Sequence, residues 1–374
     1  MPAKVVHVAA HYPPDLGGLE KVVQSLASYR SRLGLPVEVL TSHSGRRTNR
    51  APEAEFVQRL GSIHVAHTTI MPSLVPRLLR LRSDSVVHLH VSQAFTSEVV
   101  YLSSLVRKVP YVAHVHIDVG PSGTAGFLLR AYKPYILGPV LRGAKVVVVF
   151  TEEQKQAIGV KYHLDPRRIE VIPNGVETAF FAPPRRVRAR RPRLLFVGRL
   201  AVQKNIGMLL HALDGISERF DTTLVGDGEL GGELKALAER LALQNVRFHG
   251  RADGEDLLDL FRQADLFVLP SEREGMPLVL LEAMAMGLPT VATDIAGNRD
   301  VVIDGQNGRL VPLNDAAAMQ RALIELAFDE TIYARMSESA RKRGERFTWD
   351  AVGQDFEGVY ARASAGLPLT KITT

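Results

Sequence analysis

Two glutamates in the second half of the chain are candidates for carboxylate chemistry. Residues 270–284 read Pro-Ser-Glu-Arg-Glu-Gly-Met-Pro-Leu-Val-Leu-Leu-Glu-Ala-Met, with Glu274 and Glu282 eight residues apart. A proline is favoured in the first turn of a helix, so Pro277 places Glu274 in the preceding loop and Glu282 inside the helix. Carboxylates accept hydrogen bonds from hydroxyl groups, and free N–H groups at a helix start attract phosphate. The segment is therefore predicted to bind a ligand that carries both sugar hydroxyls and phosphate.

Phosphate-binding residues are predicted at two turns between a strand and a helix. Gly17 and Gly18 directly precede a predicted helix, where backbone N–H groups without side chains can approach an anion closely. Arg199 and Lys204 follow a predicted strand at 194–197 and would hold a diphosphate at the mouth of a cleft. The alternative explanations are an ordinary turn for the glycines and exposed basic residues for the pair.

A dinucleotide site is a second interpretation of the same half of the chain. Gly226-Asp-Gly228-Glu-Leu-Gly231 follows an apolar strand, as the phosphate-binding fingerprint of dehydrogenases does. The acidic residue expected at the end of the next strand is missing, and Val246-Arg-Phe-His249 stands there instead. Since Arg247 would suit a 2′-phosphate, an NADP-dependent oxidoreductase stays open as an alternative.

Two histidine pairs raise the question of a metal site. His88 and His90, and likewise His114 and His116, lie two residues apart on predicted strands, so each pair shares one face of its strand. Four imidazoles could hold zinc. No cysteine exists in the chain, and no carboxylate stands at a typical zinc-enzyme spacing beside them. We therefore expect histidines at strand ends that face a polar cleft.

Repeated strand–helix alternation predicts two doubly wound α/β domains with parallel sheets. Apolar runs predict strands at 4–10, 86–91, 111–117 and 145–150, and a second series begins at 194–197. Between the two series, residues 165–193 show no clear periodicity and contain five prolines. We expect Rossmann-like domains at 1–172 and 173–349, with a helix at 350–374 joining the first. Ligands of such sheets bind beyond the carboxyl ends of the strands.

Composition restricts the protein class further. The 374 residues include 46 Lys+Arg against 40 Asp+Glu, which gives a net charge of +6. The absence of cysteine excludes a disulfide scaffold and a cysteine nucleophile. No apolar run approaches the ~18 residues of a membrane span, no secretory signal is visible, and no nucleic-acid-binding motif is present. The sequence indicates a cytoplasmic protein, and its modest positive charge is compatible with peripheral contact to a membrane.

In these motifs the chain resembles the retaining GT-B glycosyltransferases of family 4. Six pieces occur in the family's order and span nearly the whole length. At residues 296–300 the sequence Ala-Gly-Asn-Arg-Asp differs from the Gly-Gly-x-Pro-Glu type that many members carry. The matching pieces are Gly17-Gly18-x-Glu20, His116-Ile-Asp118, Ile172-Pro-Asn-Gly-Val176, Phe196-Val-Gly-Arg199 with Lys204, Gly226-Asp-Gly228, and Glu274 with Glu282.

The resemblance implies a nucleotide-diphospho-sugar as donor, most often UDP-linked and sometimes GDP- or ADP-linked. Arg199 and Lys204 match the cations on the diphosphate, over which Gly17 and Gly18 close. Glu282 matches the carboxylate on the ribose and Glu274 the one on the donor sugar, whose 6-position His116 would contact. The base would lie near Arg251. The catalytic set implied is His116, Glu274, Arg199 and Lys204, and the donor site also includes Gly275, Met276, Pro277, Leu278 and Val279.

The resemblance also implies catalysis without a bound metal, because no Asp-x-Asp triplet is present and cations replace it. The favoured mechanism is front-face, in which the leaving phosphate helps to deprotonate the acceptor hydroxyl. A nucleotide-sugar epimerase or hydrolase and a non-catalytic sugar-binding protein are the other readings of this fold.

The acceptor is expected to contact loops of the first domain. His11, Tyr12 and Asp118 are the candidate acceptor-binding residues. A small soluble acceptor is favoured, such as a sugar, an aminocyclitol or an inositol derivative. A lipid-linked or polysaccharide acceptor at a membrane surface is the alternative, and the sequence does not determine the oligomeric state. The basic residues that would face such a membrane are Arg46, Arg47, Arg50, Arg77, Arg80 and Arg82.

Overall fold

The computed structural model describes residues 2–14, 17–43, 54–65, 68–116, 133–181 and 190–365. Asp118 and the basic residues Arg46, Arg47 and Arg50 lie outside the described residues. The chain divides into two compact units, with residues 1–173 and 349–374 in unit 1 and residues 174–348 in unit 2. The division predicted from the sequence differs from this one by a single residue at each boundary.

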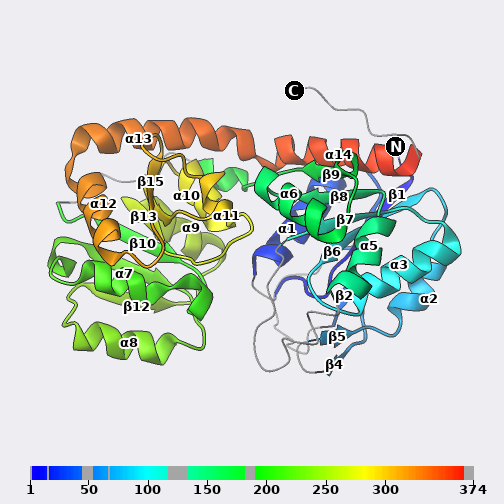
Figure 1. Cartoon of the computed structure of the whole chain (residues 1–374), viewed down its shortest axis with the longest axis horizontal. Helices are drawn as coiled ribbons and strands as arrows, with labels where there is room; N and C mark the ends of the chain where they lie inside the picture. Colours follow the sequence, from blue (N-terminus) through cyan, green and yellow to red (C-terminus); the bar gives the residue numbers. More distant parts are fainter. Residues whose placement is uncertain are drawn as a thin grey trace. The chain divides into compact units, whose positions relative to one another are not determined.

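Unit 1 is built on a seven-stranded sheet in which all neighbouring strands are parallel, in the order β3-β2-β1-β6-β7-β8-β9 (Figure 1). Valine dominates its central strands, as expected for strands that are buried on both faces. The strands of this sheet are β1 (Lys4–Val8), β2 (Val37–Ser42), β3 (Val57–Leu60), β6 (Ser85–Val91), β7 (Tyr111–Val115), β8 (Val146–Val149) and β9 (Ile169–Val171), and a separate antiparallel pair is formed by β4 (Ile63–Val65) and β5 (Thr68–Ile70).

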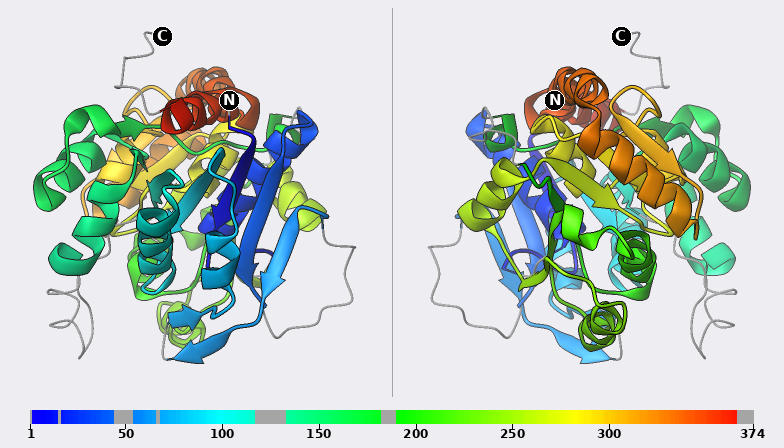
Figure 2. Two further views of the ribbon diagram at one scale, coloured as in Figure 1. Left: turned by 90° about the vertical axis from the view of Figure 1, so that its right-hand side faces the viewer. Right: turned by 90° about the vertical axis from the view of Figure 1, so that its left-hand side faces the viewer.

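Helices cover both faces of the unit-1 sheet. Because side chains alternate across a strand, Val87 and Leu89 face one layer of helices while His88 and His90 face the other. The last helix of the chain packs against α1 and against strands β6 and β7 (Figure 2). The first layer consists of α2 (Leu74–Leu79), α3 (Thr96–Arg107), α5 (Gly138–Gly143) and α6 (Glu152–Tyr162), and the second of α1 (Gly18–Arg32) and α14 (Trp349–Ala365).

Unit 2 repeats this architecture with a six-stranded parallel sheet of order β12-β11-β10-β13-β14-β15. The order reverses at β10, whose two neighbours are β11 on one side and β13 on the other. Ligands of open α/β sheets bind at such a switch point. The strands are β10 (Arg193–Val197), β11 (Asp221–Val225), β12 (Val246–Gly250), β13 (Leu266–Leu269), β14 (Thr290–Thr293) and β15 (Gly308–Val311), and the helices are α7 (Ile206–Leu213), α8 (Gly231–Arg240), α9 (Gly254–Gln263), α10 (Leu278–Ala285), α11 (Ala296–Arg299), α12 (Ala316–Phe328) and α13 (Glu330–Gly344).

The structure corrects the prediction for residues 165–193 as an unstructured break. Ile169–Val171 forms β9, the edge strand of the unit-1 sheet, and it pairs with β8 through Ile169 and Val147. Only three residues long and set between Pro166 and Pro173, this strand is too short to show a periodicity of two.

Candidate active site

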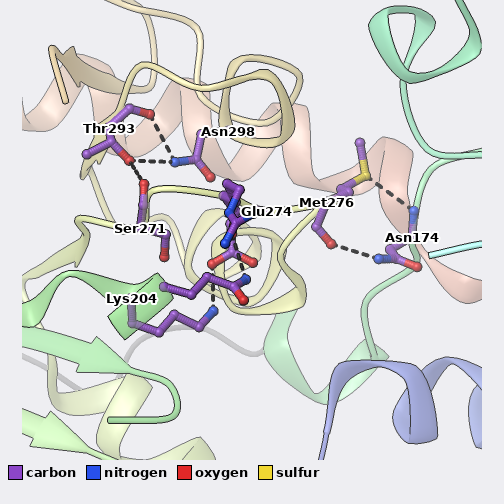
Figure 3. Close-up of polar contacts among 9 residues, drawn as sticks. Asn174, Lys204, Ser271, Glu274, Met276, Thr293 and Asn298 are labelled. Carbon is purple, nitrogen blue, oxygen red and sulfur yellow. Dashed lines mark hydrogen bonds and ion pairs between the residues drawn. The ribbon is translucent and has the colours of Figure 1, made fainter. Parts of the chain in front are cut away.

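The switch point of the unit-2 sheet brings Lys204 and Glu274 into contact. Lys204 ends a short 3₁₀ turn that follows β10, and Glu274 lies in the loop between β13 and α10. Since β10 and β13 are neighbouring parallel strands, both side chains emerge at the same edge of the sheet. The Lys204 Nζ and Glu274 Oε1 atoms are 2.6 Å apart, and the two side chains are 17% and 9% exposed (Figure 3). A cation and a carboxylate are thus held together at the site where the fold binds ligands.

The loop that carries Glu274 is held in place by hydrogen bonds on two sides. The side-chain amide of Gln203 donates to the carbonyl of Arg273 at 2.7 Å, which ties the loop to the turn after β10. On the other side, the hydroxyl of Thr293 donates to the carbonyl of Ser271 (Figure 3). Asn298 in turn donates to the carbonyl of Thr293 at 2.9 Å. The loop is therefore fixed by its neighbours on β10 and β14, as a preorganised site requires.

A third contact ties the Glu274 loop to the first residues of unit 2. The side-chain amide of Asn174 donates to the carbonyl of Met276 at 2.8 Å (Figure 3). Asn174 is buried, with 4% of its surface exposed. Asn174 of the Ile172–Val176 motif thus supports the loop from within unit 2.

Gly297 permits the close contact between α11 and the Glu274 loop. A Cβ atom at this position would lie 2.5 Å from the carbonyl oxygen of Gly275 and 2.6 Å from that of Glu274. Both neighbours are backbone atoms, so they cannot rotate away. This glycine lies in the 296–300 segment, where the chain departs from the usual sequence of the family that it resembles.

We expect Gly297→Ala to lower kcat/KM by on the order of 10², because the methyl group must displace the loop and misplacement by about 1 Å is costly in a catalytic site. The measurement is steady-state transfer kinetics together with the melting temperature. Gly232→Ala in α8 is the matched control, since nothing lies within 4 Å of its added Cβ. Equal kinetics in the two variants would contradict this role of Gly297.

Glu282 lies on α10, eight residues after Glu274, which precedes the helix. Its side chain belongs to the buried set of this helix, and the residue is 5% exposed. Pro277 is the residue that precedes the first helical turn, so α10 begins at Leu278 rather than at Pro277. Met276 is buried, whereas Gly275, Leu278 and Val279 are half-buried.

The glycines of the dinucleotide-like motif serve the packing of two loops. A Cβ atom on Gly226 would lie 1.9 Å from the carbonyl oxygen of Gly198, and one on Gly228 would lie 2.4 Å from that of Leu200. Gly226 also has a φ of +136°, which favours glycine. The spacing of these glycines thus has a structural reason that needs no dinucleotide.

Two arginines lie on loops at the same edge of the unit-2 sheet. Arg199 is exposed and follows β10. Within the described part of the chain it forms no ion pair. Arg251 follows β12, and its Nε atom lies 3.6 Å from Asp227 Oδ2 on the surface. Both arginines are accessible to a ligand at this edge.

The candidate residues of unit 1 lie at strand ends and at the start of α1. Gly17 precedes α1 with extended backbone and no side-chain cap, and Gly18 is its first residue. His11 is half-buried, and Tyr12 is buried with 4% exposure. His116 directly follows β7 and is 9% exposed.

Three of the four predicted histidines do not face a polar cleft, and for these the prediction is wrong. His88, His90 and His114 are at most 1% exposed. Phe356 of α14 packs against His88 and His114, and Tyr360 packs against His88. His7 on β1 was not predicted as a member of this group, although it lies within the strand predicted at 4–10. It is 0% exposed, stacks against His90 at a centroid distance of 5.4 Å, and pairs in register with His88 on the neighbouring strand.

These buried imidazoles are neutral. Desolvation lowers the pKa of His116 to about 3. Desolvation and, to a smaller extent, the Arg30 guanidinium lower the pKa of His7 to about 3. The pKa values of His88, His90 and His114 lie well below the usual range. Desolvation is the larger cause, and electrostatic interaction with neighbouring histidines is the smaller one. A neutral imidazole offers one N–H donor and one nitrogen acceptor.

Comparison with known proteins decides the family. The description "Glycosyltransferase Family 4" matches residues 16–180, and "Glycosyl transferases group 1" matches residues 191–329. A phosphatidyl-myo-inositol mannosyltransferase of Mycobacterium leprae is 30% identical to this chain, over 92% of the chain and 92% of that protein. The chain belongs to glycosyltransferase family 4.

Other similar proteins agree with this family-4 assignment. A D-inositol 3-phosphate glycosyltransferase of Xylanimonas cellulosilytica is 29% identical, over 95% of this chain and 94% of its own. Among solved structures, Anabaena HepE in complex with UDP superposes with a TM-score of 0.78 at 20% identity, over 96% of this chain and 99% of that one. The two Rossmann-like sheets of this glycosyltransferase are those of the GT-B fold. In the part of the chain that the structure describes, no helix has the length and apolar character needed to cross a bilayer.

Proposed function

We propose that this enzyme transfers a hexose or amino sugar from a UDP-linked donor to a hydroxyl group of a small soluble acceptor, with retention of the anomeric configuration and without a metal ion. The observation that carries the proposal is the contact between Lys204 and Glu274 at the switch point of the unit-2 sheet. The cation suits a diphosphate, and the carboxylate beside it suits the hydroxyl groups of a sugar attached to that diphosphate. The solved structures of Anabaena HepE with UDP and with UDP-glucose support a UDP-linked donor.

Each candidate residue has a role in this proposal. Arg199 and Lys204 bind the diphosphate, and Arg251 lies near the base. Glu282 binds the ribose hydroxyls, Glu274 binds the sugar, and the loop residues Gly275, Met276, Pro277, Leu278 and Val279 line the donor site. Unit 1 supplies Gly17 and Gly18 for the diphosphate and His116 for the sugar, while His11, Tyr12 and Asp118 contact the acceptor.

The reaction itself is a substitution at the anomeric carbon. The bond from this carbon to the phosphate oxygen breaks, and the acceptor oxygen bonds to the carbon on the same face. The acceptor proton moves to the departing phosphate. The positive charges of Arg199 and Lys204 stabilise the diphosphate as it leaves. Transfer monitored by NMR with UDP-, GDP- and ADP-sugars tests this scheme, and an inverted product would overturn retention. Full activity in EDTA is expected, whereas its loss would contradict the proposed independence from metal.

Ion pairs formed by two of the basic residues favour a soluble acceptor over a membrane-bound one. Arg77 pairs with Glu38 at 2.5 Å, and Arg82 pairs with Asp84 at 3.0 Å. Their charges are partly balanced within unit 1, which weakens attraction to anionic lipid. The name D-inositol 3-phosphate glycosyltransferase of one relative also fits a small polyol acceptor. Transfer that requires a lipid-linked acceptor and fails with every soluble polyol and sugar would contradict this choice.

UDP is expected to raise the melting temperature of unit 2, and NADP is not. A ligand present at 100–1,000 times its Kd stabilises the native state by about 2.7–4.1 kcal/mol. Differential scanning fluorimetry measures the shift, and Lys204→Ala should abolish it because the diphosphate loses its half-buried cation. Stabilisation by NADP with no response to UDP would favour an oxidoreductase instead.

A further inference from the structure

Five buried imidazoles form two hydrogen-bonded rows on one face of the unit-1 sheet. In the first row, His7 Nδ1 lies 3.1 Å from His90 Nε2, and His90 Nδ1 lies 3.0 Å from His116 Nε2. In the second row, the Tyr360 hydroxyl lies 2.7 Å from His88 Nδ1, and His88 Nε2 lies 3.3 Å from His114 Nδ1. Only the first row reaches His116, the residue assigned above to the donor sugar.

Counting protons leaves two arrangements for the first row. Each neutral imidazole has one N–H group, so the two hydrogen bonds must run in the same direction. In one arrangement His7 donates to His90 and His90 donates to His116, which places the proton of His116 on Nδ1. In the other, both bonds are reversed and the proton of His116 is on Nε2.

The surroundings of His7 select the first arrangement. His7 Nε2 is buried and has no hydrogen-bond partner within the described residues. The charge of Arg30, which its ion pair with Glu357 partly balances, also acts on this ring. A buried N–H group without an acceptor is rarer in proteins than a buried acceptor without a donor, so Nε2 is expected to carry the lone pair rather than the proton. His7 therefore carries its proton on Nδ1 and donates it to His90.

We propose that His7 and His90 are positioning residues that fix His116 as the Nδ1–H tautomer, so that its second nitrogen presents a hydrogen-bond donor. This inference rests on the proposed role of His116 toward an oxygen of the donor sugar. Free histidine in water favours the Nε2–H tautomer, so the row imposes the less common form. A donor N–H suits a sugar oxygen, and its fixed direction keeps the geometry ready for the substrate.

A metal ion is the competing occupant of this cluster. His90, His114 and His116 have nitrogen atoms within 4.8 Å of one another, as do His7, His88 and His90. Neither set includes a carboxylate, and His90 already uses both of its nitrogens in hydrogen bonds. A buried divalent cation would have no negative charge to balance it in either set. These observations favour the hydrogen-bonded row.

Long-range ¹H–¹⁵N correlation spectra of the full protein labelled with ¹⁵N-histidine test the proposal without any substrate. The expected spectrum of the wild type shows the Nδ1–H pattern for His116, which is assigned by its loss in His116→Phe. His90→Phe should remove this pattern and lower kcat about 10-fold, the loss of roughly one hydrogen bond, with KM for the donor nearly unchanged. His114→Phe is the matched control, since His114 stacks on His116 at 4.3 Å without a hydrogen bond to it. It should keep the Nδ1–H pattern.

Three results would overturn the inference. They are an Nε2–H pattern for His116 in the wild type, equal loss of the Nδ1–H pattern in both variants, and displacement of the His90 and His116 signals by stoichiometric Zn²⁺. An Nδ1–H pattern in a protein that turns over no nucleotide sugar would instead leave the tautomer assignment standing and contradict the proposed function.

Discussion

Replacement of Glu274 by alanine is expected to lower kcat by about 10²–10³, the loss that follows removal of one group aimed at a reacting substrate. The carboxylate is 9% exposed and is held against Lys204 by a loop that is fixed from both sides. Because its proposed partner is the sugar rather than the diphosphate, UDP should still raise the melting temperature of the variant. Transfer kinetics and differential scanning fluorimetry measure these two effects separately.

Glu272→Ala provides the matched control for this experiment. Glu272 has the same residue type in the same loop and is tied to Gln203 through its backbone N–H group, which the substitution keeps. Its kcat should remain close to that of the wild type. If the two alanine variants lose equal activity, the loss reflects the loop in general and Glu274 has no special role.

Acid is expected to destabilise unit 1 steeply below about pH 6.5. The five buried imidazoles are neutral in the native state, since burial lowers their pKa values, to about 3 for His7 and His116. In the unfolded chain they titrate near 6.5. Between these values the unfolded state binds more protons, so the free energy of unfolding falls as the pH falls. Each histidine lowers the free energy of unfolding by about 1.4 kcal/mol for each pH unit of acidification. The five together lower it by roughly 7 kcal/mol per pH unit.

The resulting loss over one or two pH units is comparable to the whole free energy of unfolding of a typical domain, which is about 5–15 kcal/mol. Urea unfolding at several pH values measures it, and Trp349 is a convenient probe because it is the only tryptophan and lies buried at the start of α14. His88→Phe should reduce the slope by about 1.4 kcal/mol per pH unit. His211→Gln, a change at an exposed position of unit 2, should leave it unchanged. A slope close to zero in the wild type would show that the imidazoles are charged in the native state. The charged groups nearest the cluster, Arg30 and Glu357, pair with each other at 2.6 Å.

Regular apolar runs allowed the fold to be predicted in outline. The strands predicted at 86–91 and 194–197 match β6 and β10 to within one residue, because strands buried on both faces are almost continuously apolar. The strands missed in the two parallel sheets, β3, β9 and β15, lie at the edges of those sheets and are three or four residues long. Edge strands bury less apolar surface, so their sequences carry a weaker pattern. The helix predicted at 350–374 corresponds to α14, which the structure describes from Trp349 to Ala365.

The candidate site was predictable to the extent that topology determines it. Lys204 and Glu274 were both assigned to turns after parallel strands, and such turns meet at one edge of the sheet. The burial of the histidines was not predictable in this way. Their shared face follows from alternation along the strands, but its cover comes from Tyr360, which lies 272 residues after His88 in the chain. Local sequence patterns carry no information about such a distant contact.

Helix α14 comes from the end of the sequence, and this position affects folding during translation. The strands with the buried histidines leave the ribosome early, but the helix that covers them is translated only after the 175 residues of unit 2. At 5–20 residues per second, this interval lasts about 10–35 s. During it, the nascent unit 1 presents an uncovered face of imidazole and apolar side chains to chaperones and to other nascent chains. Any chimaera that exchanges unit 1 must therefore carry residues 349–365 together with it, or the sheet stays permanently open.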